Sequence, residues 1–125
     1  MSKQVSVVRL SLFKDSQVSF LAALDDANIQ HQRVHLFSSG AQASGIVETI
    51  SALSDAMPWN ALAKVIVAWI DARKSREVLI QTADGKTIHA KGYSAEDVQK
   101  FLPISATIAV IDTGGSENSG ARSTT

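Results

Sequence analysis

The pair His31 and His35 is the part of the sequence that comes closest to a metal-binding motif. The two histidines lie four residues apart in a segment that alternates like a β-strand, so they point to the same face. Arg33 lies between them on that face, and its positive charge disfavours a bound cation. A zinc site would also need two further ligands at about 2 Å. The pattern therefore favours a solvated strand face over a metal site. His89 is out of phase with the apolar Ile88 and is expected to face solvent.

The sequence contains no recognisable arrangement for nucleophilic or acid–base catalysis. Its serines do not occur in a Gly-x-Ser-x-Gly elbow, and there is no cysteine to act as a nucleophile. The acidic pairs Asp25-Asp26 and Glu96-Asp97 fall in predicted helices, where adjacent residues do not share a face. The segment 38–40 has one glycine and no following lysine, so it is not a phosphate-binding loop. We therefore predict a protein that is not an enzyme and needs no cofactor.

Composition limits the partners that this chain is expected to bind. It has 125 residues, enough for one domain, and its 45% hydrophobic and 19% charged residues are typical of a globular protein. Twelve basic and twelve acidic residues cancel, which argues against nucleic acid or an anionic membrane as the main ligand. The longest apolar stretch between charges, Val65 to Ile70, is far shorter than the roughly 20 residues that span a bilayer. With no signal peptide recognisable at its start, the chain is expected to be cytoplasmic.

The first half of the sequence predicts a βαβ unit followed by a helix. Residues 5–13 form a strand whose alternation slips at Val7-Val8, which indicates a bulge or burial on both faces. A helix from about 15 to 28 and a strand over 31–37 follow, and then a polar loop over 38–44. From Gly45 onward, apolar residues at helical spacing predict a second helix that ends near residue 57: Ile46, Ile50, Leu53 and Met57.

The second half begins with a third helix, at Pro58 or just after it. Its apolar side chains occupy more than one stripe, so the helix must be covered by its own domain or by a partner. The basic run over 73–76 complements the negative end of the helix dipole. A hairpin with a type I′ turn at Asp84-Gly85, a short helix opened by Ser94 and ended by Pro103, and a strand over 107–111 complete the prediction.

Together these elements predict a small single α+β domain over residues 1–112: a βαβ unit followed by two helices, a β-hairpin, a short helix and a last strand. Residues 113–125, TGGSENSGARSTT, contain no apolar side chain larger than alanine. Such a segment cannot bury enough surface to offset its ordering entropy, so it is predicted to be a flexible polar tail.

The order of segments resembles the effector-associated constant component family of bacterial conflict systems. The resemblance covers about residues 5 to 102 and rests on VVRLSLF, VSFLAALDDA, QHQRVHLF, GIVETISALSDAMPWNALAKVIVAWI, ARKSR, EVLIQTADGKTIHAKG and SAEDVQKFL. Members of that family are small proteins encoded beside varied effectors, including protease-like ones, and carry no catalytic motif. The resemblance implies a non-enzymatic adaptor or regulatory subunit of an anti-phage or conflict system, which binds a protein effector encoded nearby. The alternative is an immunity protein or inhibitor of a toxin.

A partner surface is predicted around the third helix. Trp69 fits either the core or a contact surface, Trp59 beside Pro58 is a candidate anchor because tryptophan is enriched in binding hot spots, and the basic run is either solvated or a contact for an acidic partner. Self-association is also expected, because a helix this apolar needs a cover. The predicted interface residues are Met57, Trp59, Ile66, Trp69, Arg73, Lys74 and Arg76.

Overall fold

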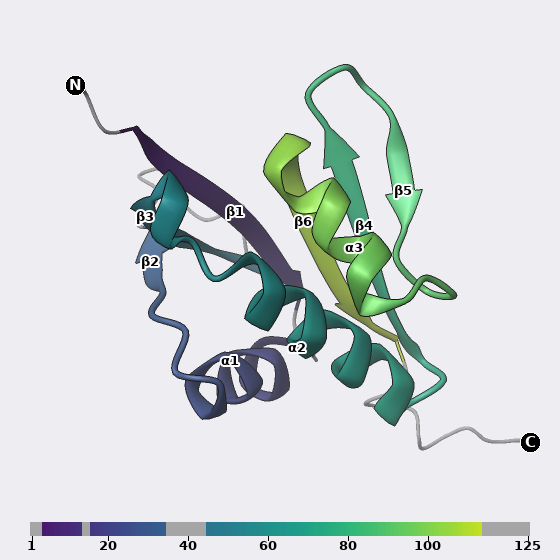
Figure 1. Cartoon of the computed structure of the whole chain (residues 1–125). Helices are drawn as coiled ribbons and strands as arrows, with labels where there is room; N and C mark the ends of the chain where they lie inside the picture. Colours follow the sequence, from purple (N-terminus) through teal and green to yellow (C-terminus); the bar gives the residue numbers. More distant parts are fainter. Residues whose placement is uncertain (1–3, 14–15, 35–44, 114–125) are drawn as a thin grey trace, which may run out of the picture.

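The computed structural model of the chain describes residues 4–13, 16–34 and 45–113, so His35, the loop over 38–44 and the tail from residue 114 lie outside the described residues. The elements follow the order β1 (Val5–Phe13), α1 (Gln17–Asp26), β2 (Gln32–Val34), β3 (Gly45–Leu53), η2 (Ser54–Ala56), α2 (Trp59–Ala72), β4 (Arg76–Thr82), β5 (Thr87–His89), α3 (Ala95–Phe101), η3 (Leu102–Ile104) and β6 (Ser105–Asp112). The strands form one sheet with the order β2-β3-β1-β6-β4-β5 (Figure 1). The predicted small α+β domain is thereby confirmed. None of the helices in the described part of the chain is both long and apolar enough to cross a membrane.

The predicted βαβ unit is present in a split form. Strands β1 and β2 are both antiparallel to β3, so they run in the same direction with β3 inserted between them. The helix α1 connects these two parallel strands. In a simple βαβ unit the two parallel strands pair directly with each other, whereas here β3 lies between β1 and β2 and pairs with both.

The prediction of a helix from Gly45 to Met57 is wrong, because residues 45–53 form the strand β3. The segment is rich in β-branched residues, which favour strands. Its period-two pattern was hidden by Glu48, which lies on the same face as Ile46 and Ile50 and is 3% exposed. Only the 3-10 turn η2 remains between the strand and Met57.

Strand β1 has no bulge. Its pairing with β3 is unbroken from Val5↔Leu53 to Phe13↔Gly45, so Val7 and Val8 point to opposite faces of the sheet. Val8 is fully buried, whereas Val7 is 54% exposed. The slip in the alternation therefore marks an apolar residue on the outer face of the sheet.

The C-terminal half agrees with the prediction except at the hairpin turn. Strand β4 pairs with β5 and with β6, and β6 lies parallel to β1. Among the turn residues only Gly85 has a positive φ, of 94°, so the turn is not the predicted type I′. The Thr82 and Lys86 backbones close a three-residue loop, which places Gly85 at the left-handed position that follows a type I turn. Helix α3 begins as predicted, with the Ser94 hydroxyl accepting from the Asp97 amide at 3.2 Å.

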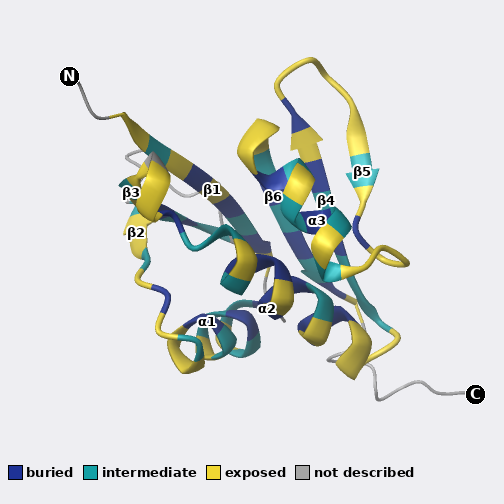
Figure 2. Ribbon diagram, viewed as in Figure 1, coloured by how far each residue is buried: buried dark blue, intermediate teal, exposed yellow. Residues whose placement is uncertain are grey.

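The helices lie on one side of the sheet, and the core is between the two layers (Figure 1; Figure 2). Helix α2 begins directly after Pro58, as predicted, and the domain itself covers much of its surface. Alternate residues of the central strands face the helices and are fully buried, among them Val8, Leu10, Leu12, Val78, Ile80, Ile108 and Val110. The other face of the sheet carries the remaining alternate residues, which are more exposed.

Candidate protein-interaction groove between α1 and α2

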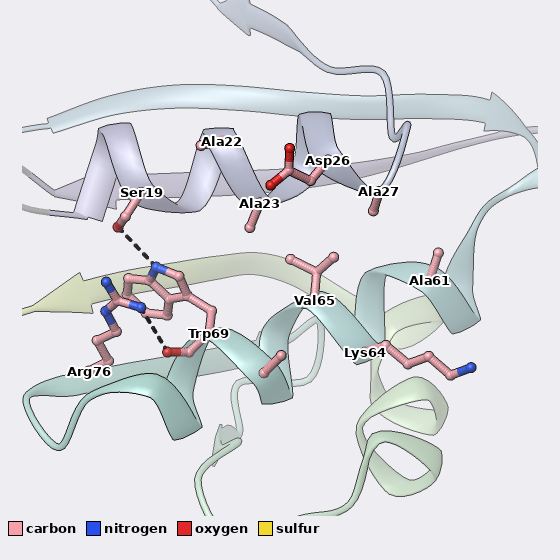
Figure 3. A pocket seen from close by; sticks show the side chains of 11 residues that line it. Ser19, Ala22, Ala23, Asp26, Ala27, Ala61, Lys64, Val65, Trp69 and Arg76 are labelled. Carbon is pink, nitrogen blue, oxygen red and sulfur yellow. Dashed lines mark hydrogen bonds between the residues drawn. The ribbon is translucent and has the colours of Figure 1, made fainter.

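An open groove of about 700 Å³ lies between α1 and α2 (Figure 3). Small apolar side chains line most of it, and its two walls come from segments about 40 residues apart in the sequence. The lining residues are Ser19, Ala22, Ala23, Asp26, Ala27, Ala61, Lys64, Val65, Ala68, Trp69 and Arg76.

The small side chains explain why the two helices leave a groove. Alanine favours helix but adds little volume between neighbouring helices. Ala22 and Ala68 are exposed, on α1 and α2 respectively, whereas Val65 at the floor is 9% exposed. Helix α1 ends at a Schellman motif, in which Asn28 has a φ of 60° and the Ile29 amide donates to the Leu24 carbonyl at 2.9 Å. Ile29 is buried, which holds this end of the wall against the core.

A tryptophan forms one end of the groove. The Trp69 ring packs edge-on against Phe20, with 5.4 Å between the ring centroids, and its indole N–H donates to the Ser19 hydroxyl at 3.0 Å. These contacts tie α2 to α1 and keep the indole in one orientation. Trp69 is 4% exposed, so its ring supports the groove wall more than it projects into solvent.

Arg76 covers the Trp69 ring, with its guanidinium carbon 4.5 Å from the ring centroid. It also donates to the Trp69 carbonyl at 3.0 Å and to the Asp112 carboxylate at 3.1 Å. The Ser75 hydroxyl donates to the other carboxylate oxygen of Asp112 at 2.7 Å. Arg76 is thus a positive charge held in place at the last turn of α2. The sequence predicted that the whole basic run over 73–76 would complement the negative end of the helix dipole.

Two opposite charges stand on the walls of the groove. Asp26 projects from α1 and Lys64 from α2, as Figure 3 shows. Both residues are exposed. An apolar floor between charged edges is the arrangement that accepts an amphipathic helix.

The predicted interface residues do not form one exposed surface. Ile66 is fully buried and Trp69 nearly so, in the core of this domain. Met57 is 7% exposed and Trp59 is half-buried against the core. Arg73 and Lys74 are exposed in the turn that follows α2. Of the predicted interface residues, only Trp69 and Arg76 line the groove. The alanines that line the rest of it could not be recognised as binding residues from the sequence.

A second polar cluster lies beside β2 and differs from the solvated strand face that the sequence predicted. The buried Glu48 carboxylate accepts from the Arg33 guanidinium at 3.1 Å and contacts His31 Nδ1 at 2.8 Å. His31 Nε2 lies 2.9 Å from the Asp25 carboxylate, and the His31 side chain is 16% exposed. His89, in contrast, faces solvent as predicted, at 63% side-chain exposure.

The two carboxylates control the charge of His31. Partial burial lowers the pKa of His31, but hydrogen bonds to Glu48 and Asp25 and their negative charges outweigh that effect and raise the pKa above its ordinary value. The imidazolium is therefore the form that this cluster stabilises. Within the described ranges, no group of three or more histidine, cysteine or acidic side chains is arranged to hold a metal ion.

Comparison with known proteins gives one match. A model of the family described as Effector Associated Constant Component 1 matches residues 14–109, which contain both walls of the groove. No curated protein and no solved structure matches the chain. The match agrees with the resemblance noted in the sequence and spans well over half of the 125 residues. The chain belongs to the effector-associated constant component 1 family, which is named for its association with effectors.

Proposed function

We propose that this protein is a non-enzymatic adaptor or regulatory subunit that binds a co-encoded effector in a bacterial defence system. The α1–α2 groove is the contact surface, and an amphipathic helix of the effector is its occupant. Membership of the effector-associated family supports the class of partner. The observation that carries the proposed surface is the open, alanine-lined groove itself.

The groove has the chemistry that such a helix requires. Exposed alanines on both walls allow another helix to approach closely, and burial of apolar surface there supplies affinity. Asp26 and Lys64 are available to a partner helix that carries complementary charges along its edges. The Arg76 guanidinium adds a positive charge beside Trp69, held in place by Asp112.

Co-purification tests the proposal. The native operon is expressed with an affinity tag on this chain, and the effector is expected to co-elute under conditions where defence operates. Ala22→Glu and Ala68→Glu place a charge on each wall and should weaken binding at least tenfold, since each buries a carboxylate against an apolar surface. Both sites are exposed and glutamate favours helix, so the fold should be retained.

Ala83→Glu is the matched control, because Ala83 is an exposed alanine in the hairpin turn, away from the groove. This variant should bind the effector as the wild type does. Absence of a co-eluting effector, or equal binding by all three variants, would contradict the proposal.

The same proteins separate an adaptor from an immunity protein. If the effector acts only when this chain is present, and the groove variants abolish that action, the chain is an adaptor. An effector that is lethal alone and harmless beside this chain would identify an inhibitor instead.

A further inference from the structure

The face of the sheet opposite the helices carries most of the exposed large apolar side chains of the described chain. On β1, the residues that alternate with the buried Val8, Leu10 and Leu12 point to this face, and the paired residues of β3 join them. Of the seven large hydrophobic residues that are exposed in the described part of the chain, four lie there: Val5 (64% exposed), Val7 (54%), Phe13 (40%) and Leu53 (38%). We call this surface the outer sheet face.

The apolar surface continues across the central strands. Register pairs place Val47, Ser11, Ala109 and Leu79 side by side on β3, β1, β6 and β4. Ile111 lies two residues beyond Ala109 on the same face of β6. These apolar side chains are half-buried by their neighbours, and none of the described helices covers them. The outer sheet face is thus a broad, mixed surface with an apolar centre.

Two opposite charges are placed symmetrically on this face. Ser11 pairs with Ala109 on one side, and Arg9 lies two residues from Ser11. Leu79 pairs with Ala109 on the other side, and Glu77 lies two residues from Leu79. Strand β6 is parallel to β1 and antiparallel to β4. Arg9 and Glu77 therefore lie on opposite sides of the row formed by Ser11, Ala109 and Leu79. Ala109 is therefore the midpoint between the two charges.

We propose that the outer sheet face binds the same face of a second copy of this chain. A two-fold axis that lies between the sheets, passes over Ala109 and runs perpendicular to the line from Arg9 to Glu77 brings each Arg9 opposite Glu77 of the second copy. Isologous dimers require such self-complementarity. Glu77 keeps its 2.7 Å contact with His89 through one carboxylate oxygen and leaves the other for Arg9. The small Ala109 allows the two sheets to approach at the centre, and face-to-face sheets pack about 10 Å apart.

The segments outside the described residues are poor in large apolar side chains that could cover this face. Residues 1–3, 14–15, 35–44 and 114–125 together contain only three apolar side chains larger than alanine, which are Met1, Leu36 and Phe37. The outer face presents eight apolar side chains across four strands: Val5, Val7, Phe13, Val47, Leu53, Leu79, Ala109 and Ile111. The net charge of zero also removes the repulsion between copies that a strongly charged chain would have. This surface is separate from the α1–α2 groove, so the dimer and the effector contact are independent.

Charge reversal tests the proposed dimer. The full chain should be a dimer at tens of micromolar by sedimentation equilibrium. Arg9→Glu and Glu77→Arg each place like charges opposite one another and should raise the dissociation constant at least tenfold. The double variant restores opposite charges and should return the constant to within about threefold of the wild type, which corresponds to less than 1 kcal/mol.

Reversals on the helix side are the matched controls. Lys100→Glu on α3 replaces a positive charge with a negative one, as Arg9→Glu does, and Asp71→Arg on α2 makes the opposite change, as Glu77→Arg does. Both positions are exposed, and both variants should leave the dimer intact. Circular dichroism confirms that each variant is folded. A monomeric wild type would overturn the proposal, and so would a dimer that survives both outer-face reversals.

A second measurement does not depend on the charged variants. The chain has no cysteine, so Ala109→Cys introduces a single thiol near the proposed axis. A short bismaleimide should link two copies of this variant, whereas Ala83→Cys in the hairpin turn should stay monomeric on a denaturing gel. Failure of Ala109→Cys to link would refute the geometry.

Discussion

Replacing His31 with alanine should destabilise the domain by about 2 kcal/mol at pH 6. The variant removes the 2.8 Å contact between His31 and Glu48, whose side chain is 4% exposed, and a hydrogen bond to a buried charged group contributes about 1.5–3 kcal/mol. The contact with Asp25 adds little, because that carboxylate is 69% exposed and surface pairs contribute about 0–1 kcal/mol. For a domain of this size, 2 kcal/mol lowers the Tm by about 8 °C.

The effect of His31→Ala depends on pH with a definite sign. The pKa of His31 is raised in the folded protein: burial lowers it, but the hydrogen bonds and charges of Glu48 and Asp25 outweigh burial. The stabilising contribution is therefore fully present below the unfolded-state pKa of about 6.5. It is lost as the pH rises through the folded-state pKa, because the folded imidazole then releases its proton. The free energy difference between wild type and variant should shrink from pH 6 to pH 9.

Urea unfolding of both proteins at each pH measures this difference, and His89→Ala is the matched control. His89 also contacts a glutamate at 2.7 Å, but the two side chains are 63% and 40% exposed. Its removal should cost less than about 1 kcal/mol at every pH. Equal losses in the two variants, or a loss in His31→Ala that does not change with pH, would refute the argument from burial.

Three further changes test the packing and the turns, each by urea unfolding. Ile66→Ala should cost about 2–5 kcal/mol, because Ile66 is fully buried under the sheet; a loss below 1 kcal/mol would place this residue outside the core. Ser94→Ala should cost about 1 kcal/mol by removing the cap on the Asp97 amide, and Ser94→Asp should restore it. Gly85→Ala should cost about 1 kcal/mol because its φ of 94° strains any side chain, whereas Gly85→Asn should cost less.

The elements that could be predicted from the sequence are those specified by neighbouring residues. Strand β1, helix α2, the β4–β5 hairpin and the capped helix α3 follow from local alternation, from Pro58, from Gly85 and from Ser94. The turn type was wrong because Asp-Gly also fits a three-residue loop. That choice depends on how β4 and β5 pair, which a short segment does not reveal.

Strand β3 could not be predicted because its pattern depends on a distant partner. The charged Glu48 interrupts the apolar alternation of the strand, and the spacing of the apolar side chains around it fitted a helix. The carboxylate is buried because His31 and Arg33 contact it from the neighbouring segment at β2. Only the β2–β3 pairing brings these groups together. The available signal of a strand was Glu48 between the β-branched Val47 and Thr49, with the basic residues His31 and Arg33 about 15 positions earlier.

The candidate surfaces also depend on tertiary structure. The groove has alanine walls from two helices, and alanine is too common in helices to indicate a binding site. Trp69 and Arg76 were identified as interface residues, but their main contacts are within the domain. The slip at Val7-Val8, which predicted a bulge or burial on both faces, was the one local signal of the outer sheet face, since Val7 places an apolar side chain there.

The position of β6 has a consequence for how the domain is completed. Strands β2, β3 and β1 and strands β4 and β5 make two separate ladders, and β6 alone joins them, although it follows all of them in the sequence. Leu10 must meet Ile108 before the sheet is continuous, so folding depends on a contact of high sequence separation. A fragment that ends at Leu102 would contain an empty strand position in the middle of its sheet. A peptide with the sequence of β6, supplied from another molecule, would fill that position and rebuild the sheet in trans.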